Sequence, residues 1–316
     1  MAGITVGPVG FGSGGFARAF RRMAVAVCPA CLLGGCASGI LDPRGPIGAA
    51  DSLILLDSAG IMAVIVVPTI VGLLAIAWWF RATNTRARYQ PDFVYSGRIE
   101  LIVWAIPILV IMFLGGVTWV GSHELDPYVP IAAKVEPNGP PLEVQVISLD
   151  WKWLFIYPQQ RLASVNEVFV PTGTAVHFYL TSATVMNQFF VPQLGSMIAT
   201  MNGMQTQLYL QADRDGDYIG QSAQFSGDGF SDMRFTVHAV SPADFQSWTA
   251  AARQSGPVLD RNGYLGLLRG SCDVQPFTYR STDPGLFAAV VKRDLPSGSG
   301  PHVGGTGAGI RSKGCG

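Results

Sequence analysis

Two long apolar runs stand out in the pattern of hydrophobic and polar positions. Residues 61–80 and 101–120 each form a stretch of 20 residues without a charged side chain. About 20 consecutive apolar residues are needed for an α-helix to cross the hydrocarbon core of a bilayer. A buried helix of a soluble core is the alternative, but two runs of this length argue against it. The pattern therefore predicts two transmembrane helices, at about 59–80 and 101–122.

The pattern changes after the second run. From about residue 142 to residue 240, β-branched and aromatic residues alternate or cluster in short runs bounded by Pro, Gly, Asn and Asp. Such runs are typical of strands, and several short strands within about 100 residues favour a Greek-key β-sandwich. We therefore expect one all-β domain over residues 126–240, preceded by an N-terminal segment and the two helices in residues 36–125.

A short helical extension is expected after the β domain. Ser241 is a suitable N-cap and is followed by a proline in the first turn and an early acid, which together predict a helix in residues 242–254. Residues 283–294 have the pattern of a second helix. We assign the extension to residues 241–294 and expect the Gly- and Ser-rich residues 295–316 to be disordered.

The charges around the apolar runs predict a topology. The loop between the runs carries one acid, Asp92, and four arginines, which are Arg81, Arg86, Arg88 and Arg98. Short loops rich in arginine stay on the cytoplasmic side of a membrane. The charges therefore predict a multi-pass membrane protein with both termini and the β domain on the outer side.

The N-terminal residues have the pattern of a secretory signal. Three arginines, Arg18, Arg21 and Arg22, precede an apolar stretch that ends at Cys36. A positive region followed by a short apolar region is typical of a cleaved signal peptide. The sequence LLGGC resembles the lipobox of bacterial lipoproteins, which implies a signal in residues 1–35 and a lipid anchor at Cys36. The resemblance to bacterial lipoproteins also implies the bacterial inner membrane, so that the outer side is the periplasm. An uncleaved apolar leader with incidental cysteines is the alternative.

Composition narrows the classes of function. The chain has 21 basic and 21 acidic residues, and only 13% of its residues are charged. The even balance gives no electrostatic case for nucleic acid, and the low charge content is typical of a membrane protein. The sequence contains no nucleophile elbow, phosphate-binding glycine loop or zinc motif. We therefore expect no catalytic centre in this chain.

Five cysteines are distributed unevenly along the chain. Cys28 and Cys31 lie in the expected signal, and Cys36 is the expected lipidation site, which leaves Cys272 and Cys315. These two can form a disulfide in an oxidising compartment. Because Cys315 lies in the Gly-rich tail, the sequence implies no fixed partner for it.

The segment GQSAQFSGDGFSDM, residues 220–233, has the spacing of a copper-binding loop without its ligands. In haem-copper oxidases that accept electrons from cytochrome c, subunit II carries a dinuclear CuA centre. Its loop reads Cys-x-Glu-x-Cys-x3-His-x2-Met, and a further histidine precedes it in a His-x-Phe-x-Val-Pro context. This chain resembles that subunit, with VMNQFFVPQLG at residues 185–195. The matching positions hold Asn187, Ser222, Gln224, Ser226, Phe230 and Met233.

Both thiolates and both imidazoles are therefore absent, and hydroxyl or amide groups do not replace such soft ligands for copper. A cupredoxin-like domain with an emptied CuA frame resembles subunit II of the quinol oxidase branch, the cytochrome bo type. The resemblance covers residues 33–294 and includes the C-terminal extension, which most cytochrome c oxidases lack.

The resemblance implies a non-catalytic, structural subunit of a proton-pumping ubiquinol oxidase that reduces oxygen to water. No cofactor is expected in this chain. The haems, CuB and the ubiquinol site are expected in subunit I, the main partner. Subunits III and IV and membrane lipid are further expected partners, and cytochrome c is not one.

Three other residues gain a possible role from the resemblance. Trp151 and Trp153, in DWKW, match an aromatic patch that admits electrons from cytochrome c in copper-bearing relatives. Without copper, we favour packing or subunit contact for both. Glu100 begins the second apolar run, where the family has a glutamate near the entrance of a proton pathway into subunit I. A solvated carboxylate at the membrane edge is the equal alternative.

Two other functions compete with this one. A free-standing lipoprotein with a cupredoxin-like binding domain, such as an envelope chaperone, would leave the two-helix anchor without a partner. A cytochrome c oxidase subunit that lost copper by drift fits less well, because every side-chain ligand except Met233 is replaced and the C-terminal extension is present.

Overall fold

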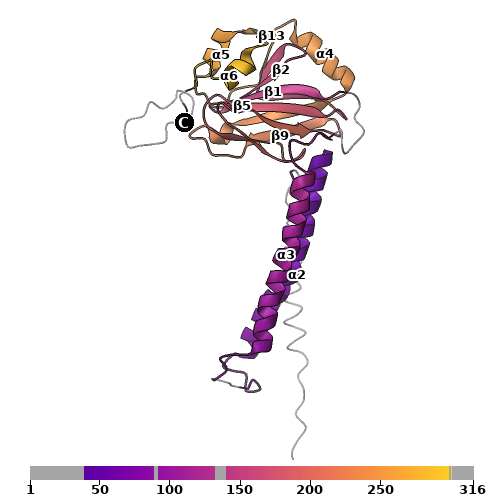
Figure 1. The fold of residues 1–316 in the computed structure, drawn as a ribbon, viewed down its shortest axis with the longest axis vertical. Helices are drawn as coiled ribbons and strands as arrows, with labels where there is room; N and C mark the ends of the chain where they lie inside the picture. The colour runs from indigo at the N-terminus through magenta and orange to yellow at the C-terminus, as the bar shows by residue number, and fades with distance from the viewer. Residues whose placement is uncertain (1–38, 89–91, 132–139, 299, 301–316) are drawn as a thin grey trace, which may run out of the picture. The chain divides into compact units, whose positions relative to one another are not determined.

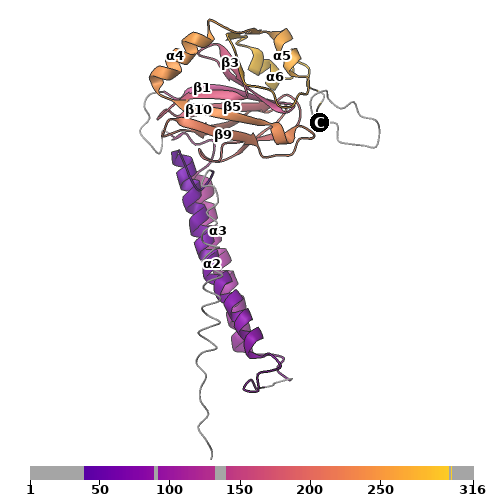
Figure 2. The ribbon, with the colours of Figure 1, turned by 180° about the vertical axis from the view of Figure 1, so that it is seen from behind.

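The computed structural model describes residues 39–88, 92–131, 140–298 and 300. Two long apolar helices confirm the predicted membrane pair. Helix α2 is Pro46–Trp79 and helix α3 is Gly97–Glu124, and both are long and apolar enough to cross a membrane. They run side by side in both views (Figures 1 and 2). Their side chains are exposed along almost the whole of both helices, so these surfaces are available to lipid or to other membrane helices.

Helix α2 begins at Pro46, well before the predicted start near residue 59. At 1.5 Å per residue its 34 residues extend about 51 Å, whereas the hydrocarbon core is about 30 Å thick. The apolar pattern detects only the part that crosses the membrane. Asp51 and Asp57 interrupt that pattern, but they do not interrupt the helix.

The predicted all-β domain is a sandwich of two large sheets. The six-stranded sheet has the order β12-β3-β2-β1-β5-β8, in which β12 is Phe277–Tyr279, and the five-stranded sheet has the order β4-β10-β9-β6-β7. Within them, β1 pairs in parallel with β5 and β10 with β4, and the other pairs are antiparallel. The strands up to the end of the β domain are β1 Leu142–Leu149, β2 Lys152–Tyr157, β3 Leu162–Val165, β4 Glu167–Pro171, β5 Val176–Ser182, β6 Asn187–Phe190, β7 Ile198–Thr200, β8 Thr206–Leu210, β9 Gly216–Ser222 and β10 Arg234–Val240.

Aromatic side chains from both sheets form the centre of the sandwich core. Trp153 of β2 lies 5.5 Å from Phe189 of β6 and from Phe235 of β10, measured between ring centroids. Phe189 and Phe235 stack at 4.9 Å. All three are buried. Edge-to-face and offset contacts of this kind add to the stabilisation that apolar burial provides.

The C-terminal extension is only partly helical. Helix α4, Pro242–Ala252, is capped by the Ser241 side chain, which accepts from the Asp244 backbone N–H, so the first predicted helix is confirmed. The second predicted helix is present as the shorter α6, Leu286–Val291. Figures 1 and 2 show α4 on the opposite side of the domain from α6. The remaining elements are α5 Arg261–Leu267, β11 Val258–Leu259, β12 Phe277–Tyr279 and β13 Ser281–Thr282.

The extension is continuous with the sandwich. Strand β12 pairs with β3 and so adds an edge to the six-stranded sheet. A second apolar core joins the outer face of that sheet to the extension, with Leu154 and Ile156 of β2 buried against residues such as Tyr264 and Phe287. As a result β2 is buried along its whole length.

A close-packed joint connects α2 to the β domain. The Arg44 backbone N–H donates to the Gln193 carbonyl at 2.7 Å, and the Gly48 N–H donates to the Leu194 carbonyl at 3.0 Å. A β-carbon at Gly45 would overlap the carbonyl oxygen of Gln211. Glycine is therefore needed where the chain enters α2.

Candidate functional site

The six positions of the copper frame meet at one end of the inner strands of the five-stranded sheet. Asn187 begins β6 and Ser222 ends β9, and these strands pair with Phe189 opposite Ser222. The segment between β9 and β10, which includes the 3₁₀ helix η3 Phe230–Asp232, carries the other four: Gln224, Ser226, Phe230 and Met233. The spacing read from the sequence therefore corresponds to one place in the fold.

Polar side chains of the frame bond to one another. The Ser222 hydroxyl donates to Asn187 Oδ1 at 3.1 Å, and Ser222 Oγ accepts from the Gln224 backbone N–H at 3.5 Å. Asn187 Nδ2 donates to the Val185 carbonyl at 3.4 Å. Asn187 and Ser222 are both buried. These hydrogen bonds offset the cost of burying the polar groups without any bound ion.

Ser226 and Met233 close the other side of the frame. Both side chains are buried, and Ser226 Oγ lies 4.0 Å from Met233 Sδ. The Trp151 indole N–H donates to the Ser226 carbonyl at 3.0 Å, and the Ser222 N–H donates to the Met233 carbonyl at 3.2 Å. The loop is thus held in place by the protein's own hydrogen bonds.

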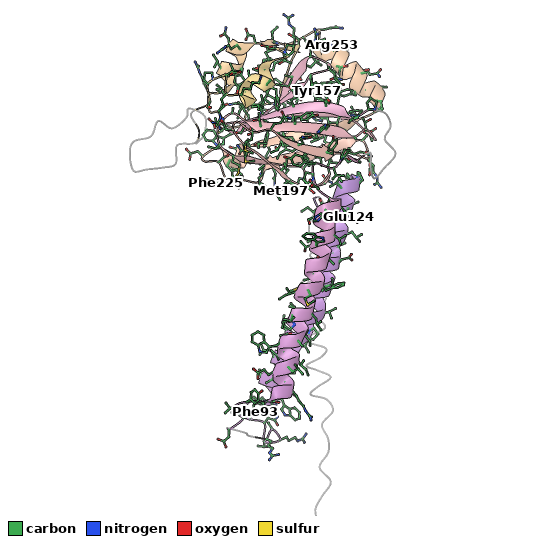
Figure 3. All side chains as sticks on the ribbon, in the orientation of Figure 1. Phe93, Glu124, Tyr157, Met197, Phe225 and Arg253 are labelled. Atoms are coloured by element: carbon green, nitrogen blue, oxygen red, sulfur yellow. The ribbon has the colours of Figure 1, made fainter. Side chains whose placement is uncertain are left out.

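Phe230 has an aromatic partner at the loop surface. Its ring centroid lies 5.6 Å from that of Phe225 in an edge-to-face arrangement. Phe225 is 74% exposed and lies at the lower edge of the domain in Figure 3, on the same edge as Met197. A phenyl ring has no lone pair for a metal, so the position at which the family has an imidazole contributes only apolar contact.

The donor set of this frame does not fit a CuA centre. Met233 supplies the only sulfur among the six side chains, and a thioether alone does not replace thiolate and imidazole ligands. Across residues 39–88, 92–131, 140–298 and 300, no group of three or more His, Cys, Asp and Glu side chains is placed to hold a metal ion. We therefore derive no metal chemistry from this loop.

The two tryptophans of DWKW are both packed inside the protein. Trp153 is fully buried in the aromatic core, and Trp151 is 6% exposed. Trp151 has a positive φ of 64° in the turn between β1 and β2, an uncommon backbone conformation for a bulky residue. A β-carbon at Gly270 would lie 3.1 Å from the Trp151 ring, so the extension covers the indole. These contacts agree with packing, whereas contact with another subunit stays a prediction.

Lys152 has a structural role that the sequence did not reveal. Its ammonium donates to the Arg269 carbonyl at 2.7 Å and to Ser271 Oγ at 2.7 Å, and the side chain is buried. It therefore ties the β1–β2 turn to the extension. Burial lowers the pKa of Lys152 from 10.5 to about 8, against the opposing effect of the Asp150 charge. A lysine in a short β-rich run is normally solvated, so no sequence signal pointed to this role.

Lys152 makes the stability of the folded chain depend on pH. Between about pH 8 and pH 10.5 the unfolded lysine keeps its proton while the folded one has lost it, so rising pH favours the folded state. From pH 8 to 9.5 we expect wild type to gain about 1.5 kcal/mol relative to Lys152→Met. Urea unfolding of both proteins in detergent at several pH values measures this difference, and parallel pH curves would contradict it.

Glu100 lies in the first turn of α3 and is exposed. Its backbone N–H donates to the Ser96 carbonyl at 3.0 Å, and a carboxylate at this end of a helix is favoured by the helix dipole. The structure thus places Glu100 at the start of the helix that holds the second apolar run, and its position at a membrane edge stays a prediction. Its role in proton transfer stays a prediction.

Several predicted features lie outside the described residues. These are the signal peptide, the lipidation site at Cys36, and most of the C-terminal tail. Cys28, Cys31 and Cys315 lie outside them as well.

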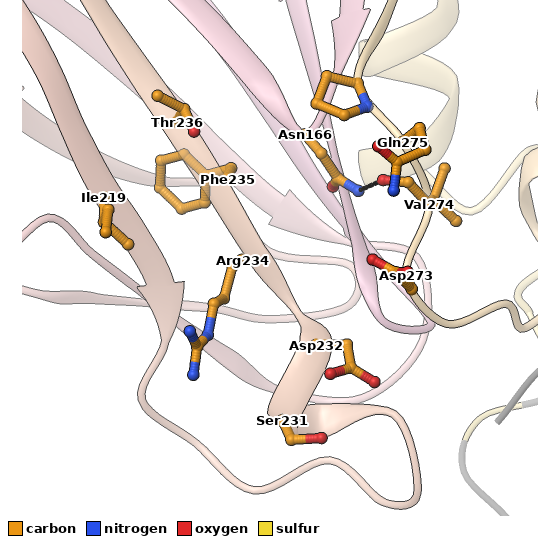
Figure 4. A pocket seen from close by; sticks show the side chains of 11 residues that line it. Asn166, Ile219, Ser231, Asp232, Arg234, Phe235, Thr236, Asp273, Val274 and Gln275 are labelled. Carbon is orange, nitrogen blue, oxygen red and sulfur yellow. Dashed lines mark hydrogen bonds between the residues drawn. The ribbon is translucent and has the colours of Figure 1, made fainter. Parts of the chain in front are cut away.

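A groove of about 550 Å³ separates the end of the loop from the extension. Asp232 and Arg234 line it on one side, and Asp273 and Gln275 line it on the other (Figure 4). Asn166 and Val274 also line it, and Asn166 Nδ2 donates to the Val274 carbonyl at 2.8 Å, the dashed line in Figure 4. The extension is therefore attached beside the emptied frame.

Known proteins resemble this chain in sequence. The family described as "Cytochrome C oxidase subunit II, periplasmic domain" matches residues 142–240. Cytochrome bo(3) ubiquinol oxidase subunit 2 of Pseudomonas aeruginosa is 43% identical over 269 residues, which are 85% of this chain and 80% of that protein.

Two further relatives have similar coverage. Ubiquinol oxidase subunit 2 of Acetobacter aceti is 44% identical over 264 residues, 84% of this chain and 85% of that protein. Quinol oxidase subunit 2 of Bacillus cereus is 33% identical over 256 residues, 80% of this chain and 87% of that protein. The similarity therefore extends well beyond the β domain.

Proposed function

The chain belongs to the ubiquinol oxidase subunit II family, and from this premise we propose that it is the copper-free, non-catalytic subunit of an enzyme that oxidises ubiquinol and reduces oxygen to water. The hydrogen bonds within the emptied copper frame support the proposal that this subunit binds no copper. Asn187 and Ser222 bond to each other at the place where ligands would be needed. Electrons that arrive from a quinol within the membrane need no copper relay on the outer surface.

Subunit I is the partner on which this function depends. It holds the haems, CuB and the ubiquinol site in the proposed complex, with subunits III and IV and membrane lipid as further contacts. The exposed apolar surfaces of α2 and α3 support this arrangement, since membrane helices of this kind pack against other helices. The chain itself braces subunit I and covers its periplasmic face.

The covered state of Trp151 supports the absence of cytochrome c as an electron donor. Its indole N–H is used by the Ser226 carbonyl, and its ring packs against Gly270 of the extension. An electron entry site needs an exposed surface at which the donor protein can dock. Trp151 offers no such surface here.

Glu100 is the proposed entrance of a proton pathway into subunit I, which would make the complex proton-translocating. We expect Glu100→Gln to lower quinol-driven oxygen uptake several-fold, because an amide does not exchange protons with water as a carboxylate at a membrane edge does. Oxygen uptake and proton release by the purified complex in proteoliposomes measure the effect.

Glu124→Gln is the matched control for this substitution. Glu124 is an exposed carboxylate at the other end of the same helix. The Glu124→Gln variant is expected to keep the wild-type rates of oxygen uptake and proton release. Equal rates for the Glu100→Gln variant and wild type would refute the proton-entry role and leave Glu100 as a solvated carboxylate only.

The lipid anchor and the sidedness belong to the same proposal. Both termini and the β domain are periplasmic, and Cys36 carries acyl chains at the start of the mature chain. Acyl chains add about 0.8 kcal/mol of membrane affinity per buried methylene, so beside two spans the lipid has a positional role. Intact mass spectrometry should show a diacylated N-terminus that Cys36→Ala lacks, and an unmodified wild-type Cys36 would refute this part.

The experiment that tests the function is purification of the tagged chain from its native membrane in mild detergent. We expect subunit I to co-purify, with haem bands in a reduced-minus-oxidised spectrum. A haem-free eluate without a second subunit would instead favour a free-standing lipoprotein with a cupredoxin-like domain.

A further inference from the structure

Helices α2 and α3 have a groove between them, and each helix contributes a proline to it. Where α3 ends the two helices touch, since a β-carbon at Gly121 would lie 2.9 Å from Ile54 Cδ1. Further along, Pro68 of α2 and Pro107 of α3 line a groove of about 740 Å³. Every residue that lines this proline groove belongs to α2 or α3, so the groove is open to whatever surrounds the helix pair.

The proline groove lies within the two apolar runs that span the membrane. Its ten lining residues fall in the ranges 61–69 and 102–110, and neither range holds a charged side chain. Nine of the ten are apolar, and Thr69 is the exception. The hydrocarbon core has no water that could bond to exposed backbone groups. A polar group of this groove therefore has to find its partner in protein.

Each proline leaves one backbone carbonyl without its helical donor. Proline has no N–H, so the carbonyl four residues before it in a helix loses its regular hydrogen bond. The two carbonyls are those of Val64 and Val103. Both residues line the proline groove, and they are 74% and 60% exposed. Because an unpaired carbonyl is costly in hydrocarbon, the groove has two acceptors that need a donor.

The lining of the groove does not supply that donor. Thr69 carries the only hydroxyl among the lining side chains, and its Oγ1 already donates to the Ile65 carbonyl at 2.7 Å. The other nine side chains are apolar and have no hydrogen to donate. The donor for Val64 and Val103 therefore comes from the molecule that occupies the groove.

We propose that a transmembrane helix of subunit I occupies the proline groove, and that serine or threonine hydroxyls of that helix donate to the freed carbonyls of Val64 and Val103. This inference rests on the proposed function, which makes subunit I the partner. Hydroxyl side chains of neighbouring helices are a usual partner for backbone groups that proline frees in membrane helices. A lipid acyl chain fills apolar space but brings no donor, so the carbonyls favour a helix.

The occupied groove also brings subunit I to Glu100. Ile102 lines one end of the groove and follows Glu100 by two residues, which is about 3 Å along a helix axis. A helix that fills the groove therefore reaches the level of Glu100. A proton entrance into subunit I requires this proximity.

Site-specific photocrosslinking in the native membrane tests the occupant. A diazirine amino acid replaces Ile106, which lines the groove. The control carries it in place of Ile108, which is exposed and does not line the groove. We expect position 106 to capture a subunit I peptide that contains serine or threonine, and position 108 not to capture it. Lipid at position 106, a peptide without a hydroxyl residue, or the same peptide from both positions would overturn the inference.

The same preparation separates this inference from the proposed function. If subunit I co-purifies while position 106 captures lipid, the inference is wrong and the function stands. If subunit I is absent from the purified complex, both are wrong.

A double-mutant cycle tests the hydrogen bonds. Replacing the captured serine by alanine, or the captured threonine by valine, should shorten the lifetime of the complex in detergent several-fold. In Pro68→Ala/Pro107→Ala each helix regains the N–H that bonds to Val64 or Val103, and alanine keeps the helix intact. The subunit I replacement should then change the lifetime little. An equal loss in both backgrounds would show that the hydroxyl does not donate to these carbonyls.

Discussion

Replacing Asn187 and Phe230 by histidine and Ser222 and Ser226 by cysteine is expected to turn the emptied frame into a copper site. The four positions lie at one end of the inner strands of the five-stranded sheet, and Met233 is already buried beside Ser226. Thiolates and imidazoles are the ligands that copper prefers there. We expect the variant to bind a pair of copper ions per chain and to show a purple thiolate-to-copper absorbance, whereas wild type binds no copper stoichiometrically.

The variant with only Asn187→His and Phe230→His is the matched control. It provides both imidazoles without a thiolate, so it should lack the purple absorbance and release its copper to a chelator. Copper analysis after dialysis and visible spectroscopy compare the three proteins. A folded four-residue variant without bound copper would show that the backbone of the loop no longer has the geometry of a copper site.

Gly45→Ala is expected to destabilise the joint between α2 and the β domain by about 2–3 kcal/mol, the usual cost of overpacking a rigid site. The added β-carbon would overlap the Gln211 carbonyl oxygen, which is backbone and does not move cheaply. The φ of Gly45 is −151°, a conformation open to alanine, so the effect comes from lack of space. For a chain of this size the melting temperature should fall by roughly 3–5 °C.

Gly60→Ala is the control for this prediction, since Gly60 lies in the same helix and a β-carbon there meets no other atom within 4 Å. Thermal unfolding of both variants in detergent measures the difference. The control should melt at the wild-type temperature or slightly above it, because alanine favours a helix over glycine. Equal melting temperatures for the two variants would mean that the joint contributes little to stability.

The sequence predicts the membrane helices, the β domain and the first helix of the extension, because each depends on a local signal. A long uncharged run and the Ser241 cap are such signals, and the structure confirms both. The start of α2 was predicted too late because the helical part outside the membrane is not continuously apolar. The short elements α5 and β12 were missed, since their positions depend on contacts with β3 and the outer face of the sheet.

The candidate site was predictable as a set of positions and not as a set of contacts. The spacing of residues 220–233 placed Ser222, Ser226 and Met233 in one loop. The bond between Ser222 and Asn187 arises from the pairing of β6 with β9, which no local pattern encodes. In the same way, the contacts of Trp151 with Ser226 and of Lys152 with Arg269 depend on tertiary packing.

The most direct test of the account is the choice of electron donor by the purified complex that contains this chain. Oxygen uptake is measured with a soluble ubiquinol and, separately, with reduced cytochrome c. We predict rapid uptake with the quinol, no uptake with cytochrome c alone, and no change when cytochrome c is added to the quinol reaction. Rapid uptake driven by reduced cytochrome c would contradict the account. Electrons would then enter through a subunit in which Asn187, Ser222, Ser226 and Phe230 stand in place of the copper ligands.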